Sequence, residues 1–146
     1  TDRYYAPLAA TTYTLTIPSS TRFLEDVREF VTMHASKAGF TELVVEQVKM
    51  AVDEACTNVI EHAYEGQNEQ PVEIAIIVTE DDFTVRIRDK GRQFNQQSYR
   101  EPDLIQYAKT KKSGGFGVHI MRKLMDDVIY QSSGGFNECC LVKHRQ

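Results

Sequence analysis

The sequence predicts an α+β domain built as a two-layer sandwich, with helices on one face of a mixed, mostly antiparallel sheet. The chain has 146 residues, which fits one domain that can bury a core without metals or disulfides. Segments of alternating apolar side chains are separated by segments with helical spacing. Their order is strand, two helices, two strands, a loop, a helix and two strands, which favours helices gathered on one side of the sheet.

The charge and cysteine content exclude several classes of protein. The net charge is −4, so there is no basic footprint for nucleic acid. No apolar run approaches the length that crosses a bilayer, and no membrane partner is expected. The three cysteines are odd in number and do not form a disulfide framework. We therefore expect a reduced, cytoplasmic protein.

The first part of the chain predicts a strand followed by a helix. Residues 1–10 are expected to form a loose end. Residues 13–17 alternate apolar side chains with threonine, which predicts a short strand closed by Pro18. One of the serines at 19–20 can cap the helix that follows, and Gly39 ends it.

A second helix and a hairpin come next. Thr41 begins the helix, whose apolar stripe continues to about Tyr64. Alternation over residues 72–78 and again over 83–89 predicts two paired strands, and the acidic residues 80–82 form the turn.

The last third begins with a long polar segment, residues 91–114, of weak periodicity. Loops of this length in compact domains are usually functional or mobile. A short helix is expected near 103–108. A glycine cluster at 114–117 then leads into a helix. Residues 128–130 and 139–142 form a final hairpin.

The second helix carries the first group of candidate residues. At ~100° per residue, Glu54, Asn58, Glu61 and Glu65 share one face, with His62 at its border. Glu54 and Asn58 are one turn apart and can converge on one site. A carboxylate can act as a general base, and an amide oxygen suits Mg²⁺. Taken alone, the spacing fits a solvated helix face better than a site.

Asp89 ends the second strand of the hairpin. A period of two places it on the core face with Phe83, Val85 and Ile87. A buried carboxylate without a partner is costly, so it needs a donor, which a ligand amino group can supply. An aspartate that caps a turn with Gly91 fits the pattern equally well.

The segment from Ser113 to Gly117 leads into a helix. Glycines let a backbone approach phosphates, and a helix N-terminus offers free N–H groups and a positive dipole end. Lysines 109, 111 and 112 can add positive charge. The cluster is a weak signal by itself. It is neither a Walker A loop, which continues with Gly-Lys-Ser/Thr, nor a Rossmann fingerprint, which directly follows a strand.

Together, these segments resemble one known superfamily over residues 17–143. Residues 53–64 resemble the N box of the Bergerat ATPases, in the form D-E-A-x-T-N-x-x-E-H-A-Y found in the anti-sigma-factor kinase branch. Residues 89–94 resemble the D-x-G-x-x-F box, and 115–121 the second glycine box. Residues 124–128 match the L-M-D-x-V that often follows in that branch.

The resemblance implies a Bergerat fold with ATP and Mg²⁺ as cofactors. Asp89 would accept a hydrogen bond from the adenine amino group, and Gly91 would let the nucleotide approach the backbone. Asn58 would coordinate Mg²⁺. Glu54 would be the general base that takes the proton of a serine or threonine hydroxyl as the γ-phosphoryl transfers. Residues between Gly91 and Gly114 would form the ATP lid.

The resemblance also implies a wider set of nucleotide-site residues, in which Gly115 and Gly117 would contact the phosphates. The set is Asn58, His62, Asp89, Gly91, Phe94, Gly114, Gly115, Phe116, Gly117 and Val118. We interpret His62 as a helix-border histidine near the site, because the histidine-kinase branch carries its phosphoacceptor on a separate helical hairpin. Cys56 is expected in the core. The last strand has no threonine to match one that often approaches adenine in this family.

Three functions remain open for a domain of this type. The resemblance implies a kinase that phosphorylates a STAS-type anti-sigma antagonist and sequesters a sigma factor, often as a homodimer. A non-catalytic module could instead hold nucleotide to sequester a partner. An ATPase piece of a larger two-component or chaperone protein is disfavoured by the branch-specific form of the N box.

Overall fold

The computed structural model describes residues 10–65, 67–91 and 113–145, with residues 113–118 described by their backbone alone. Phe94, Lys109, Lys111 and Lys112 therefore lie outside the described residues. So do residues 1–9 of the loose end expected over 1–10, residues 92–112 of the lid expected over 91–114, and the short helix expected near 103–108.

Five strands form one sheet in the order β1-β2-β3-β5-β4. Every pair of neighbouring strands in the described residues is antiparallel. The prediction of a mixed, mostly antiparallel sheet allowed some parallel pairing, and these strand pairs have none. The φ angles of Gly134 and Gly135 are +61° and +84°, as the tight turn between β4 and β5 requires. The strands are β1 (Thr11–Pro18), β2 (Pro71–Val78), β3 (Asp82–Asp89), β4 (Asp127–Ser133) and β5 (Phe136–His144).

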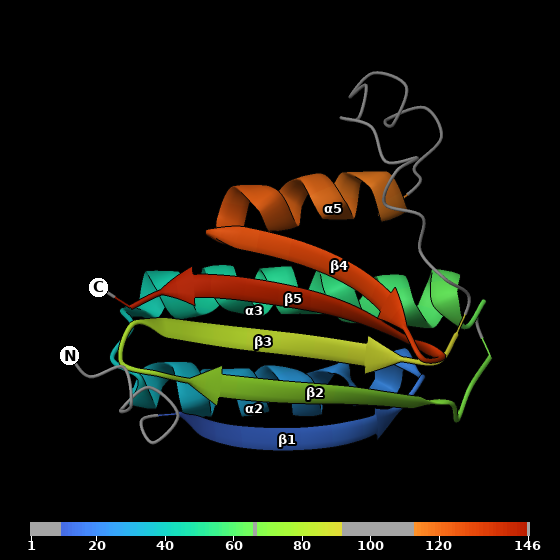
Figure 1. Ribbon diagram of the computed structural model, residues 1–146, viewed down its shortest axis with the longest axis horizontal. Coiled ribbons are helices and arrows are strands. Elements are labelled where there is room, and N and C mark those ends of the chain that lie inside the picture. The colour runs from blue at the N-terminus through green and yellow to red at the C-terminus, as the bar shows by residue number, and fades with distance from the viewer. Residues whose placement is uncertain (1–9, 66, 92–112, 146) are drawn as a thin grey trace.

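Helices α2 (Leu24–Lys37) and α3 (Glu42–Asn58) cover one face of the sheet, and α5 (Ser113–Leu124) packs against α3 beside them (Figure 1). Thr41 caps α3 as predicted, because its side chain accepts a hydrogen bond from the N–H of Val44. No helix of the described ranges is both long and apolar enough to cross a membrane. The two-layer α+β prediction is confirmed.

The start of the first helix also matches the sequence prediction. Ser20 caps a single turn, η1 (Thr21–Phe23), by accepting a hydrogen bond from the N–H of Arg22. Helix α2 follows directly. Gly39, just beyond its end, has a φ of +98°, which a glycine adopts without the strain that a side chain would cause.

The core lies between the helices and the sheet. Strand β3 alternates buried and more exposed residues, so Phe83, Val85, Ile87 and Asp89 all point to the helix layer. Cys56 is fully buried, as predicted.

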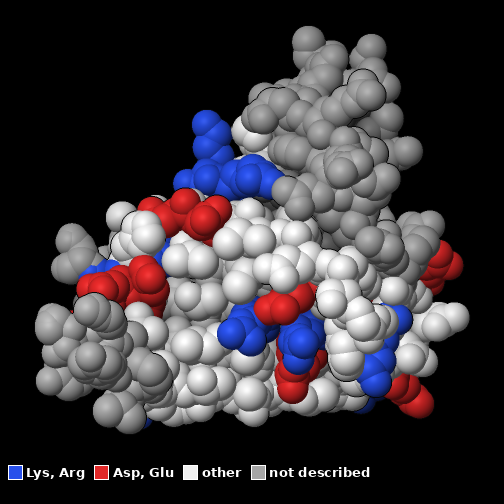
Figure 2. Space-filling model, in the orientation of Figure 1, with Lys and Arg blue, Asp and Glu red and all other residues white. Residues whose placement is uncertain are grey.

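No helix of the described residues covers the other face of the sheet (Figure 2). Figure 2 shows charged side chains grouped in the middle of this face among uncharged ones. Arg86 and Arg88 lie 3.3 and 3.8 Å from Glu138, and Arg88 lies 3.7 Å from Glu73. Such ion pairs add little stability where they are solvated.

The second helix differs from the prediction beyond Asn58. A π-helical segment, η2 (Val59–Ala63), continues the chain to Tyr64, whose N–H bonds to the carbonyl of Val59 at 2.9 Å. A π turn is wider than an α turn, so side chains after Asn58 lie in a different register. The face predicted at helical spacing therefore does not extend to Glu65, which follows the segment with a φ of +53°.

Candidate active site

Glu54 and Asn58 lie one turn apart in the regular part of α3, before the π segment. Both side chains are partly buried, and the buried Ala55 and Cys56 between them hold the helix against the core. Burial raises the pKa of the Glu54 carboxyl above its usual value, and the charges of Asp53 and Glu61 add to this. A carboxylate with a raised pKa is a stronger base for a hydroxyl proton.

Asn58 carries an unsatisfied oxygen. Its Oδ1 is buried and has no hydrogen-bond partner, one of two such side-chain atoms among the described residues. A buried polar atom without a partner loses its hydration and gains nothing in return. A neutral amide oxygen is a hard ligand of the kind Mg²⁺ prefers, so this atom fits a magnesium ion.

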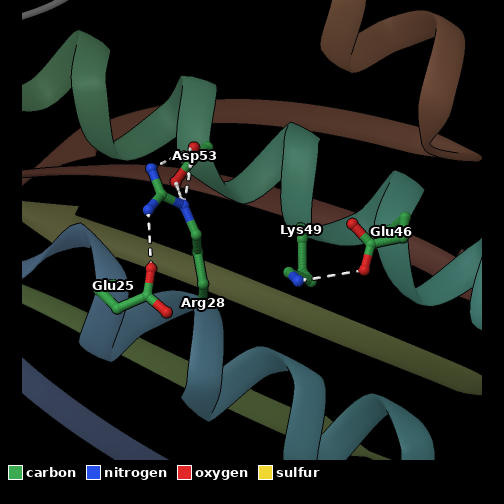
Figure 3. A network of polar contacts seen from close by, with 5 residues as sticks. All are labelled: Glu25, Arg28, Glu46, Lys49 and Asp53. Carbon is green, nitrogen blue, oxygen red and sulfur yellow. Dashed lines mark hydrogen bonds and ion pairs between the residues drawn. The ribbon is translucent and has the colours of Figure 1, made fainter.

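An ion-pair network holds the residue that precedes Glu54 (Figure 3). The guanidinium of Arg28 in α2 donates to both carboxylate oxygens of Asp53, with N···O distances of 3.0–3.2 Å. Its third nitrogen donates to Glu25 at 3.0 Å. A two-pronged contact fixes geometry as well as charge. The network therefore ties α2 to α3 beside Glu54.

Asp89 is 4 % exposed at the end of β3. Its Oδ1 accepts hydrogen bonds from the N–H of Gly91 and from Nδ2 of Asn137, both at 2.8 Å. Burial raises the pKa of this carboxyl, and the two hydrogen bonds oppose that rise. The turn cap predicted with Gly91 is present, and it occupies only one carboxylate oxygen.

The backbone around position 91 leaves no room for a side chain, so this position requires glycine. A Cβ at this position would lie 2.4 Å from the carbonyl oxygen of Ala63 and 2.9 Å from Cδ1 of Tyr64. Such separations are shorter than any van der Waals contact, so no side chain fits. The resemblance implies a close approach of nucleotide at Gly91, and the same glycine also packs against η2.

Tyr64 joins the same junction. Its hydroxyl donates to the carbonyl of Pro71 at 2.7 Å and accepts from the N–H of Lys90 at 2.8 Å. The end of the N-box helix is thereby fixed to the start of β2 and the end of β3. Asn58 and Asp89 are thus carried by two elements that meet at one buried junction.

The glycine cluster lies inside α5, which begins at Ser113, whereas the sequence predicted a helix that follows it. Gly114, Gly115 and Phe116 therefore lie in the first turn, where backbone N–H groups have no partner within the helix. The glycine segment therefore offers free backbone N–H groups of the kind that bind phosphates. Gly117 and Val118 follow in the same helix. The buried Met121 anchors α5 in the core.

The remaining predicted residue is His62, which lies exposed on η2. Sequence reasoning missed Arg28 and Asn137, whose partners are 25 and 48 residues away along the chain. No local pattern pairs residues so far apart. The register of β5 against β3, which places Asn137 opposite Asp89, is the signal that identifies Asn137.

Comparison with known proteins gives a consistent result. A family profile described as "Histidine kinase-like ATPase domain" matches residues 17–143. The chain is 35% identical over 124 residues to a protein of Bacillus velezensis named "Serine-protein kinase RsbW", covering 82% of this chain and 77% of that protein. It is 31% identical over 126 residues to one of the same name from Listeria monocytogenes, covering 83% and 80%.

A solved structure shares the fold. It is titled "The crystal structure of the RsbU and RsbW domains of Rv1364c from Mycobacterium tuberculosis". The TM-score is 0.65 at 12% identity, over 91% of this chain and 32% of that one.

Proposed function

The chain belongs to the histidine kinase-like ATPase domain family, and on that premise we propose that it transfers the γ-phosphoryl group of ATP to a protein serine or threonine. Curated relatives at 31–35% identity over most of both chains are named as serine-protein kinases. One observation carries the proposal. The side-chain oxygen of Asn58 is buried without a hydrogen-bond partner, and Glu54 lies one turn before it in α3.

In the proposed reaction, Glu54 accepts the proton of the substrate hydroxyl. The hydroxyl oxygen forms a bond to the γ-phosphorus, the bond from that phosphorus to the β–γ bridging oxygen breaks, and ADP leaves. The raised pKa of Glu54 favours the proton transfer. The contribution of the protein to such a reaction is mainly positioning and charge stabilisation.

Asn58 would hold Mg²⁺ through its amide oxygen. When bound, Mg²⁺ neutralises charge on the phosphates. The N–H groups of the first turn of α5 would bind the phosphates, which suits the positive end of a helix dipole. We propose that Gly114, Gly115, Phe116, Gly117 and Val118 line this phosphate site, and that His62, Gly91 and Phe94 belong to the nucleotide site.

Asp89 would recognise the base. An ionised carboxylate only accepts hydrogen bonds, so it selects a base edge that carries an amino group. The 6-amino group of adenine is such a donor, whereas guanine presents a carbonyl oxygen at the same position. Asp89 therefore favours ATP over GTP.

The protein partners follow from the family resemblance. We propose a STAS-type anti-sigma antagonist as the phosphorylated substrate and a sigma factor as the sequestered partner. A homodimer and a cytoplasmic location belong to the same proposal.

The experiment is phosphoryl transfer from γ-labelled ATP–Mg²⁺ to a purified STAS-domain partner, with Glu54→Gln alongside. Label on a partner serine or threonine, lost by at least about 100-fold in the variant while ATP binding persists, supports the proposal. Control of partner binding without transfer, unchanged by Glu54→Gln, would instead indicate a non-catalytic module.

A further inference from the structure

Three side chains from three adjacent strands form a hydrogen-bonded row that ends at Asp89. Ser132 in β4 donates to Oδ1 of Asn137 in β5 at 2.8 Å. Nδ2 of Asn137 donates to Oδ1 of Asp89 in β3 at 2.8 Å and to the carbonyl of Gly91 at 3.0 Å. The strand register places each pair directly opposite, so all three side chains lie on the helix-covered side of the sheet.

The orientation of the Asn137 amide follows from its neighbours. The carboxylate of Asp89 and the carbonyl of Gly91 are both acceptors, so the group facing them must be the NH₂. The hydroxyl of Ser132 can donate, so the oxygen faces it. The reverse orientation would set the amide oxygen against two acceptors. Ser132 therefore helps to keep the donor side of Asn137 turned toward Asp89.

The contacts leave the two oxygens of Asp89 unequal. Oδ1 receives both hydrogen bonds that Asp89 makes with described residues, from Gly91 and Asn137. The torsion that turns a carboxylate about its bond to Cβ is broad and nearly two-fold. Two donors on one oxygen fix that torsion, and the second oxygen is left in one direction to accept from a ligand.

We propose that Asn137 is a positioning residue for base recognition: it holds one oxygen of Asp89 so that the other meets the exocyclic amino group of the nucleotide base. This inference rests on the proposed function, because it specifies how the same site reads its nucleotide. Asn137 acts through Asp89. Burial raises the pKa of Asp89, and the hydrogen bond from Asn137 acts in the opposite direction, which favours the ionised, accepting form.

A different role would be purely structural, in which Asn137 only joins β5 to β3. The two roles separate when the ligand is changed. A structural role affects every nucleotide equally, whereas a positioning role affects only nucleotides with an amino group at the 6-position. The measurement is therefore a double-mutant cycle in which the side chain of Asn137 and the 6-amino group of the nucleotide are each removed, alone and together. The cycle gives the coupling between these two groups.

The experiment compares the dissociation constants of ATP and purine riboside triphosphate, which has hydrogen in place of the 6-amino group. The wild type is expected to prefer ATP by roughly 10- to 100-fold, the range for a hydrogen bond to a charged group. Asn137→Leu should lose at least about tenfold of that preference through weaker ATP binding. Its affinity for purine riboside triphosphate should stay within about twofold of wild type.

Two further variants keep the test decisive. Ser132→Ala removes only the bond to the Asn137 oxygen, and should lower the ATP preference by about threefold; it serves if Asn137→Leu does not fold. Gln131→Met loses a side-chain amide from an exposed position of β4 and should leave the preference unchanged.

The outcomes are distinguishable. Equal preference for ATP in wild type, Asn137→Leu and Ser132→Ala would overturn the positioning role and leave the kinase proposal intact. A parallel loss of affinity for both nucleotides would also overturn it, in favour of the structural role. A wild type that binds neither nucleotide, or binds both equally, would overturn the adenine assignment of Asp89 itself.

Discussion

Glu54, the proposed general base, lies where a negative charge is unfavourable. Burial, Asp53 and Glu61 all raise its pKa, which means that the folded protein favours the neutral acid. The ionised form that a general base requires is therefore less stable in the fold than in the unfolded chain. Such local conflict is common at active sites, where stability is given up for function.

We predict that Glu54→Gln raises the free energy of unfolding at neutral pH by about 0.5–2 kcal/mol, or roughly 1–8 °C in Tm. The stabilisation that Glu54 contributes is present at low pH and is lost as the pH rises through its raised folded-state pKa. The gain of the variant should therefore disappear in acid, where wild-type Glu54 is neutral. Thermal melts across pH test this, and a Tm below wild type at neutral pH would contradict it.

Arg28 contacts Asp53, the charged neighbour of Glu54. Its guanidinium neutralises Asp53, whose charge contributes to the raised pKa of Glu54. We predict that Arg28→Met raises that pKa further, so the acidic limb of the rate of phosphoryl transfer moves to higher pH. Single-turnover rates against pH are the measurement.

The matched control lies on α3, the helix that carries Glu54. Lys49 pairs with Glu46 at 3.1 Å (Figure 3), in a solvated contact between residues three apart. Lys49→Met should leave the pH profile in place. Identical pH–rate profiles for Arg28→Met and wild type would show that Arg28 does not influence the pKa of Glu54.

Individual site residues differ in how far the sequence reveals them. Helical spacing places Glu54 and Asn58 on one face, and strand alternation places Asp89 on the core face, because both patterns depend only on neighbouring residues. Their roles follow from the family resemblance. The buried placement of Asp89 is confirmed by its 4 % exposure. Arg28 and Asn137 contact the site across separate elements, so their roles require the tertiary fold.

The junction of η2 with the end of β3 is the element-scale feature that positions the site. Gly91 packs against the carbonyl of Ala63, and Tyr64 bonds to the strands on either side. The extent of the second helix was predictable from its apolar stripe. The change to π geometry at Val59 was not, because it depends on where these distant contacts hold Tyr64.

We predict that Gly91→Ala destabilises the protein by about 3 kcal/mol or more, since a Cβ meets backbone that cannot move independently. Nucleotide binding should weaken as well, because the junction carries Asp89. Gly39→Ala is the matched control: a Cβ there meets nothing within 4 Å, but the φ of +98° strains it, for roughly 1–2 kcal/mol. Chemical denaturation measures both, and equal losses would show that the Ala63 contact is unimportant.

The proposed nucleotide site draws on segments that are far apart along the chain. The N-box helix would supply Glu54 and Asn58, β3 would supply Asp89, and α5 would supply backbone N–H groups. The sequence predicted the two-layer class and the order of elements from periodicity alone. The strand order β1-β2-β3-β5-β4, which makes Asn137 the neighbour of Asp89, required the structure.

We propose that Asn58 and Asp89 bind opposite ends of one nucleotide, the first through Mg²⁺ and the second through the base. The most direct test is ATP affinity with and without Mg²⁺ in the wild type, Asn58→Leu and Asp89→Asn. Asn58→Leu should lose the gain in affinity that Mg²⁺ provides and bind metal-free ATP like wild type. Asp89→Asn should bind at least about tenfold more weakly in both conditions. A full Mg²⁺ gain in Asn58→Leu, together with unchanged affinity in Asp89→Asn, would contradict the account.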